Sequence, residues 1–203
     1  MVKIINIDLH HPETELLEQA RQVLAAGGLV IVPTETVYGI ACDPSVPGAM
    51  EKLVAAKGRK GNKPIARLAA DIEQVKADAM NWSDGLQDLA SKHWPGPLTI
   101  VLKTSSGWTG YRVPDHAVAL QLAEHCGHGL ALTSANQSGT SDTKTVEAAI
   151  DAIDADLALD SGPSAEHAIP STVVKVDGKT IECLREGYLP FLDVKQVFIK
   201  GLI

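Results

Sequence analysis

Cations clustered between residues 57 and 63 could bind an anion. The stretch KGRKGNKP carries Lys57, Arg59, Lys60 and Lys63, and its glycines allow the backbone to wrap. Lys57 and Arg59 are two residues apart, so they point the same way if this stretch is extended. The GxxxxGK[ST] pattern of a P-loop is absent, so phosphates would be held chiefly by side-chain cations. A solvated charged loop is the alternative interpretation.

Hydroxyl and amide side chains follow two apolar runs. In VPTETVYG, Thr34, Thr36 and Tyr38 are spaced by two, so an extended backbone would present their hydroxyls on one side. In LALTSANQSG, Ser134 and Asn136 alternate in the same way. Such groups suit hydrogen bonding to a small polar ligand at strand ends, where α/β sheets usually bind ligands. The alternatives are a threonine-capped turn leading into a helix and a serine or Asx turn that caps one.

Other segments carry isolated candidates. Ser171 opens the run STVV, Arg112 lies in YRVP, and Arg185 lies in CLREG. A lone arginine is most often a surface residue whose stem packs on the core, so none of them indicates a site by itself. No metal site is expected, because the stretch HCGH lacks two further ligands at zinc spacing.

The elements that must position these side chains follow the pattern of an α/β protein, in which short β-rich runs alternate with helical segments. Helices are expected over residues 12–27, 48–58, 71–79, 83–94 and 115–126, and from about residue 145. Strands are expected over residues 28–33, 64–70, 97–103, 111–114, 129–133, 157–160, 171–176 and 180–185. Several neighbouring strands have no helix between them, so the sheet should be mixed.

The composition predicts one globular domain over residues 1–203. A formal net charge of −7 argues against broad attraction to nucleic acid or to an anionic membrane. The 3 cysteines are far apart and form no CxxC pair, which fits reduced thiols in the cytoplasm. No signal-like start and no apolar run of membrane-spanning length are found, so a cytoplasmic location without membrane contact is expected.

Seven motifs in fixed order resemble the threonylcarbamoyl-AMP synthase family, the YrdC/TsaC-type proteins. They are PTETVYGIACDP, KGRKGNKPI, WPGPLTIVL, YRVPDH, LTSANQSG, IPSTVV and LREG, and they extend from about residue 15 to residue 188. The resemblance implies a YrdC-like twisted mixed sheet with flanking helices and a large concave cavity. It also implies a nucleotidyltransferase that joins L-threonine, bicarbonate and ATP and releases pyrophosphate. Mg²⁺ is the expected accompanying ion. The product, L-threonylcarbamoyladenylate, would pass to tRNA-modifying proteins for N6-threonylcarbamoyladenosine at position 37 of tRNA.

The resemblance also implies roles for individual residues. The KxR…SxN signature of the family, with catalytic roles, falls on Lys57, Arg59, Ser134 and Asn136. Nucleotide contacts fall on Arg59, Lys63, Ser134, Ser141 and Arg185. Contacts to threonine fall on Thr34, Thr36, Tyr38, Arg112, Thr133 and Ser171. Catalysis would then consist mainly of positioning and electrostatics, with Arg112 pairing with the amino acid carboxylate.

The sequence departs from the family pattern at several positions. Lys60 stands where a proline is common, Leu68 where a histidine is common, and Ala168 where a glycine is common. The stretch GTSDT is shorter than the usual GxPSPT, which bears on the assignment of Ser141. Two alternatives remain open at this point. One is an RNA-binding or ribosome-maturation module without synthase activity, with weak RNA binding, and the other is a carbamoyl-transfer paralogue.

Overall fold

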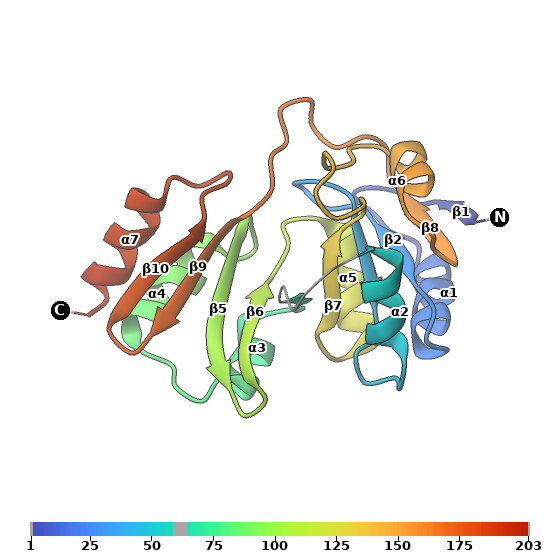
Figure 1. Cartoon of the computed structure of the whole chain (residues 1–203). Helices are drawn as coiled ribbons and strands as arrows, with labels where there is room; N and C mark the ends of the chain where they lie inside the picture. The colour runs from blue at the N-terminus through green and yellow to red at the C-terminus, as the bar shows by residue number, and fades with distance from the viewer. Residues whose placement is uncertain (1, 59–64, 203) are drawn as a thin grey trace.

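The computed structural model describes residues 2–58 and 65–202, which form a mixed α/β fold (Figure 1). The strands are β1 (Lys3–Asn6), β2 (Val30–Val32), β3 (Gly39–Cys42), β4 (Ala66–Leu68), β5 (Leu98–Thr104), β6 (Gly107–Arg112), β7 (Leu130–Ser134), β8 (Leu157–Asp160), β9 (Thr172–Asp177) and β10 (Thr180–Arg185). The helices are α1 (Thr14–Ala25), α2 (Ala49–Ala56), α3 (Ile72–Asp78), α4 (Asp84–His93), α5 (Ala117–Cys126), α6 (Val146–Ala152) and α7 (Phe191–Lys200). Within the described part of the chain, no helix has the length and apolar character needed to cross a bilayer.

All of these strands belong to one sheet, in the order β1-β8-β2-β3-β7-β4-β6-β5-β9-β10. The pairs β1/β8, β2/β8, β4/β6 and β5/β9 are parallel. The pairs β2/β3, β3/β7, β4/β7, β5/β6 and β9/β10 are antiparallel. The predicted mixed sheet is therefore confirmed.

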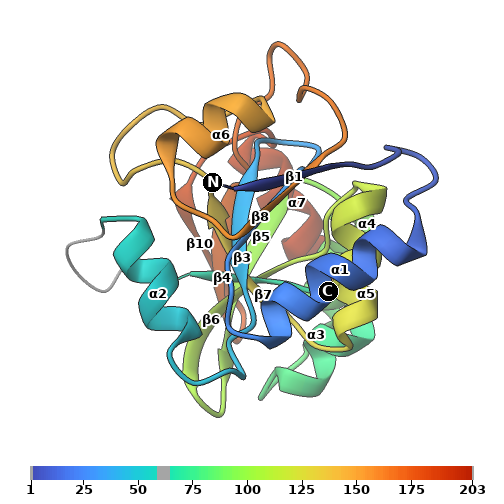
Figure 2. The ribbon, with the colours of Figure 1, turned by 90° about the vertical axis from the view of Figure 1, so that its right-hand side faces the viewer.

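Helices cover both faces of the sheet on the N-terminal side of the fold. Figure 2 shows α1 and α5 on one side of the strands and α2 and α6 on the other. In β2, Val30 and Val32 pack with α1 and α5, while Ile31 packs with α2 and α6. This alternation is what the two-residue period of a strand dictates, so a fully apolar strand is buried on both faces.

On the C-terminal side of the fold, the helices of the described residues cover one face of the sheet. Alternate residues of β5, such as Ile100 and Leu102, pack with buried residues of α3, α4 and α7. The intervening residues Thr99 and Val101 line a hollow instead. Residues of β6 and β9 alternate in the same way, so the uncovered face of these strands forms the floor of the hollow.

Three elements were not predicted from the sequence, namely β1, β3 and α7. Strand β1 buries only Ile5, and β3 begins at Gly39 directly after a polar bend, so neither shows the apolar run that marks β2. Helix α7 buries Val194 and Phe198 against α4, where Gly85 allows the close approach because a Cβ there would lie 2.6 Å from the Phe198 carbonyl oxygen. The strand expected at residues 111–114 also differs, since β6 begins at Gly107 and ends at Arg112 as the second strand of a hairpin with β5.

Candidate active site

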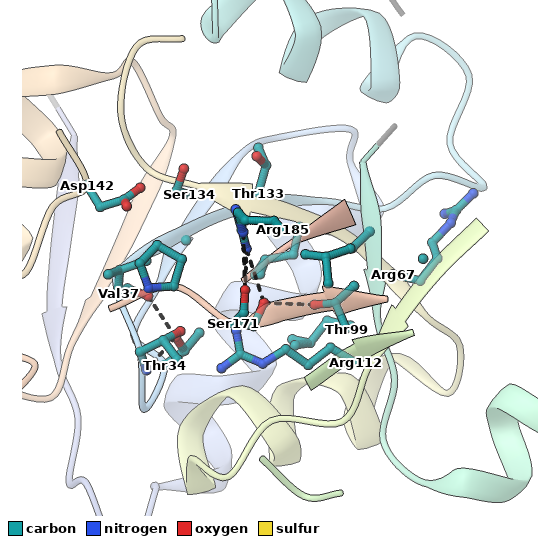
Figure 3. A pocket seen from close by; sticks show the side chains of 18 of the residues that line it. Thr34, Val37, Arg67, Thr99, Arg112, Thr133, Ser134, Asp142, Ser171 and Arg185 are labelled. Carbon is teal, nitrogen blue, oxygen red and sulfur yellow. Dashed lines mark hydrogen bonds between the residues drawn. The ribbon is translucent and has the colours of Figure 1, made fainter. Parts of the chain in front are cut away.

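A cavity of about 500 Å³ lies over the uncovered face of the sheet (Figure 3). It is lined by Thr34, Thr36, Val37, Tyr38, Gly39, Ala66, Arg67, Leu68, Thr99, Val101, Gly110, Arg112, Leu132, Thr133, Ser134, Asp142, Pro170, Ser171, Val173, Leu184 and Arg185. The lining combines hydroxyl groups and guanidinium groups with an aliphatic floor. This mixture suits a polar, anionic ligand that also carries a flat or apolar part.

The segment between β2 and β3 forms one wall of the cavity. It bends at residues 35–37, so the extended backbone expected for Thr34, Thr36 and Tyr38 is not found. The Thr34 hydroxyl donates to the Val37 carbonyl oxygen at 2.7 Å and lies 3.0 Å from the Thr36 hydroxyl. The expected turn leads into strand β3 of a hairpin and not into a helix, which corrects the alternative of a threonine-capped helix start. The two threonine hydroxyls are thus held together at the wall.

The Tyr38 hydroxyl does not join this pair of threonines. It donates to the Gly162 carbonyl oxygen at 2.6 Å, beyond the end of β8. Burial raises the pKa of Tyr38 well above its usual range, so the phenol stays protonated and remains a donor. Tyr38 lines the cavity, but its hydroxyl is used to fasten the hairpin to the neighbouring strand.

Ser171, Thr99 and Arg185 form a hydrogen-bonded group at the opposite wall (Figure 3). The Ser171 hydroxyl lies 2.9 Å from the Thr99 hydroxyl. Arg185 donates to the Ser171 carbonyl oxygen from Nη2 at 2.8 Å and from Nε at 3.2 Å. Burial and the charge of Arg112 lower the pKa of Arg185, whereas the charge of Asp142 raises it, so a carboxylate and a second guanidinium lie within electrostatic reach of Arg185. These contacts fix the orientation of Arg185 in the cavity.

Arg112 projects into the cavity from the end of β6, and its guanidinium reaches toward Thr34 (Figure 3). Its Nη2 atom lies 2.6 Å from Oε2 of Glu35, in the bend between β2 and β3. Its Nε atom donates to the Gly96 carbonyl oxygen at 3.3 Å. The sequence reasoning did not assign a role to Glu35. The only signal was an acid between two threonines at a strand end.

Lys57 lies beside the cavity and not on its lining. Its side chain is buried, at 2% exposure, and Nζ donates to the Ser134 carbonyl oxygen at 2.5 Å. Nζ also donates to the carbonyl oxygen of Asn136 and, at 2.8 Å, to its Oδ1 atom. The Ser134 hydroxyl donates to the same Oδ1 atom at 2.6 Å. Lys57 therefore holds the end of β7 and the loop that follows it in place. The sequence predicted a role for Lys57 at the phosphates but not these contacts.

The structure brings together most of the residues that were predicted as contacts. Lining the cavity are Thr34, Thr36, Tyr38, Arg112, Thr133, Ser134, Ser171 and Arg185. Asn136 lies behind this lining, and its Nδ2 atom donates to the Thr140 carbonyl oxygen at 2.7 Å and to that of Ser141 at 3.2 Å. Ser141 is exposed and does not line the cavity. Arg59 and Lys63, like Lys60, lie outside the described residues.

Two of the departures from the family pattern differ in their positions. Leu68 lines the cavity, whereas Ala168 is buried elsewhere.

Asp142 was not predicted, although it is the single carboxylate among the described residues that line the cavity. Within the described ranges, no group of three or more metal-ligating side chains is found.

The comparisons with known proteins agree with this architecture. The Sua5_yciO_yrdC family model, described as telomere recombination, matches residues 22–187. The chain is 34% identical over 184 residues to the threonylcarbamoyl-AMP synthase of Vibrio vulnificus, which covers 84% of this chain and 98% of that protein. It is 37% identical over 186 residues to the threonylcarbamoyl-AMP synthase of Rattus norvegicus, which covers 82% of this chain and 65% of that protein.

A solved structure extends this likeness to three dimensions. P. abyssi Sua5 complexed with L-threonine superimposes with a TM-score of 0.87 at 29% sequence identity. The match covers 96% of this chain and 60% of that one, so the chain spans about three fifths of that protein. The range 22–187 contains every described residue that lines the cavity. The similarity thus includes the candidate site as well as the sheet.

Proposed function

Because the chain belongs to the Sua5/YciO/YrdC family, we propose that it is an L-threonylcarbamoyladenylate synthase. It uses L-threonine, bicarbonate and ATP, and it releases pyrophosphate. The single observation that carries the proposal is the cavity, in which Arg112 and Arg185 face a space also lined by the hydroxyls of Thr34, Thr36 and Ser171. The synthase names of relatives at 34% and 37% identity support it.

The reaction explains why the cavity needs cations. The threonine nitrogen forms a bond to the carbon of bicarbonate, and water leaves, or to the carbon of carbon dioxide, and the amine loses a proton. Either route gives an N-carboxylate. An oxygen of this carboxylate then attacks the α-phosphorus of ATP, and the bond to pyrophosphate breaks. Both partners in the second step are anions, so guanidinium groups that are held in place stabilise their encounter and the charge on the departing group.

The two arginines are assigned to different substrates. Arg112 pairs with the carboxylate of threonine, whose hydroxyl and amine lie near Thr34, Thr36 and Ser171. Arg185 contacts the phosphates, together with Ser134. The likeness to P. abyssi Sua5, whose structure contains L-threonine, supports an amino acid site in this fold. Arg59 and Lys63 are assigned to the phosphates from the sequence motif alone.

Lys57 and Asn136 contribute by shaping the site. The hydrogen bonds from Lys57 hold the Ser134 and Asn136 carbonyl groups, and this fixes the backbone from which Ser134 reaches the cavity. A buried ammonium near the phosphates also adds positive potential without direct contact. Lys57 therefore contributes positive charge to the site, and Lys57 and Asn136 together stabilise the backbone around Ser134.

Asp142 fits the Mg²⁺ ion that accompanies ATP. Mg²⁺ is usually bound by one or two carboxylates together with the phosphates of the substrate. The described lining offers one carboxylate, Asp142, in a cavity that otherwise carries arginines. Asp142 would hold the ion, and the ion would neutralise part of the phosphate charge.

The product is passed to the proteins that complete N6-threonylcarbamoyladenosine at position 37 of tRNA, and we place the protein in the cytoplasm. Its three cysteines are free thiols, which supports a reducing compartment. An RNA-binding module or a carbamoyl-transfer paralogue is not favoured, because relatives that cover most of the chain carry the synthase name.

Pyrophosphate release tests this proposal. We expect release from ATP to require both L-threonine and bicarbonate, because the N-carboxylate is the nucleophile. The control reactions omit threonine, replace it with L-serine or L-valine, or use buffer depleted of carbon dioxide. Release that continues at the full rate without threonine or without bicarbonate would exclude the synthase assignment.

A further inference from the structure

Glu35 and Arg112 form an ion pair between two segments that are far apart in the sequence. Oε2 of Glu35 lies 2.6 Å from Nη2 of Arg112. The side chains are 18% and 9% exposed, so the pair is largely shielded from water. Neither carboxylate oxygen has a well-aligned hydrogen bond with the described residues, so the contact acts through charge and proximity. Such a shielded pair is screened less by salt than a surface pair.

The two side chains have different access to the cavity. Arg112 lines it, whereas Glu35 does not. Glu35 instead lines a second cavity, together with His116 and Ser164. Burial lowers the pKa of His116, which leaves this imidazole largely neutral at pH 7. Arg112 is therefore the charged partner of Glu35, and Glu35 contacts it from the side away from the ligand.

The guanidinium of Arg112 is held at two of its nitrogens. Nε donates to the Gly96 carbonyl oxygen at 3.3 Å, and Nη2 faces Glu35. The Nη1 group has no such partner among the described residues. A guanidinium that is held in this way keeps one edge for a carboxylate, and less conformational entropy is lost when the ligand binds.

We propose that Glu35 is a positioning residue that orients Arg112 toward the carboxylate of the amino acid substrate. The inference rests on the proposed function, because it requires an amino acid in this cavity. Glu35 does not touch the substrate and acts only through Arg112. Its loss should weaken the binding of threonine and leave the binding of ATP nearly unchanged, because Glu35 contacts Arg112 and has no contact with Arg185 or Ser134, the groups assigned to ATP.

The test compares Glu35→Gln, Glu35→Asp, Arg112→Gln and the double variant Glu35→Gln/Arg112→Gln. The matched control is Glu73→Gln, since Glu73 pairs with Lys76 at 2.7 Å on the surface, with 76% of its side chain exposed. The KM values for threonine and ATP are measured by pyrophosphate release. Threonine affinity is also measured by calorimetry.

We expect Glu35→Gln to raise the KM for threonine by about tenfold, with the KM for ATP changed by less than about twofold. Glu35→Asp keeps the charge and should recover part of the loss. In the Arg112→Gln background, Glu35→Gln should have no further effect on threonine affinity, because its target is gone. Glu73→Gln should have the same KM values for threonine and ATP as the parent protein.

Several outcomes would overturn the inference and leave the proposed function intact. One is a Glu35→Gln enzyme whose KM for threonine equals that of the parent. Another is a loss of threonine affinity on Glu35→Gln that persists in full in the Arg112→Gln background. A third is an equal rise of the KM values for threonine and ATP. If Glu35→Gln does not fold, Glu35→Asp decides, because it must raise the KM for threonine selectively. A parent protein without threonine-dependent pyrophosphate release would instead refute the proposed function itself.

Discussion

The Lys57→Ala variant is expected to lose pyrophosphate release by about a hundredfold or more and to be less stable than the parent protein. Lys57 is buried, and its ammonium binds the Ser134 carbonyl oxygen, the Asn136 carbonyl oxygen and Asn136 Oδ1. Alanine leaves these acceptors without that donor. Each buried acceptor that loses its partner costs about 1–3 kcal/mol, less where water enters the gap. The loop that carries Ser134 should therefore move.

Urea denaturation and pyrophosphate release measure the two effects in parallel. The matched control is Lys52→Ala on the same helix, α2, because Lys52 pairs with Asp156 at 2.7 Å with 48% of its side chain exposed. An exposed pair of this kind contributes about 0–1 kcal/mol, so the control should remain nearly as stable and fully active. A Lys57→Ala protein with unchanged stability would show that the hydrogen bonds to the loop are unimportant. Normal turnover would contradict its catalytic contribution.

The Arg185→Lys variant is expected to raise the KM for ATP by about tenfold while it keeps the positive charge. Lysine cannot reproduce the two hydrogen bonds from Nε and Nη2 to the Ser171 carbonyl oxygen. The charge would then be less well fixed in the cavity. Because Arg185 is assigned to the phosphates, the KM for threonine should rise less than the KM for ATP.

A second arginine that donates from the same two nitrogens, in this case to a carboxylate, provides the control. Arg21 donates to Glu18 from Nε at 2.6 Å and from Nη2 at 2.7 Å on helix α1, with 38% of each side chain exposed. Arg21→Lys should leave both KM values unchanged. If Arg185→Lys behaves like Arg21→Lys, or if it raises the KM for threonine more than the KM for ATP, the assignment of Arg185 to the nucleotide is wrong.

The sequence allowed the sheet to be predicted where the strands are apolar and long enough to show a period. Strand β5 and helix α1 are examples, since each buries a regular set of aliphatic residues. Strand β3 was missed because it begins at a glycine and directly follows a polar bend. Its place is set by pairing with β7, which is a long-range contact that a local pattern does not contain.

The candidate site was predicted mainly through the resemblance, because hydroxyls and isolated arginines are common on surfaces. The structure brings Arg112, Ser171 and Arg185 to one cavity from three separate segments. Glu35 was missed because its importance arises from a partner that lies on another strand, β6. The bonds from Lys57 to Ser134 and Asn136 likewise join positions that are far apart in the sequence, with separations of 77 and 79 residues. Spacing within one motif does not reveal contacts of this kind.

The most direct measurement of the central claim is the fate of labelled bicarbonate. The protein is incubated with ATP, L-threonine and carbon-13 bicarbonate, and the adenylate product is analysed at once by mass spectrometry. The account predicts an AMP adduct that contains both threonine and one labelled carbon, and it predicts that Lys57→Ala forms almost none. An adduct of threonine and AMP without the labelled carbon, or AMP and pyrophosphate with no adduct, would contradict it.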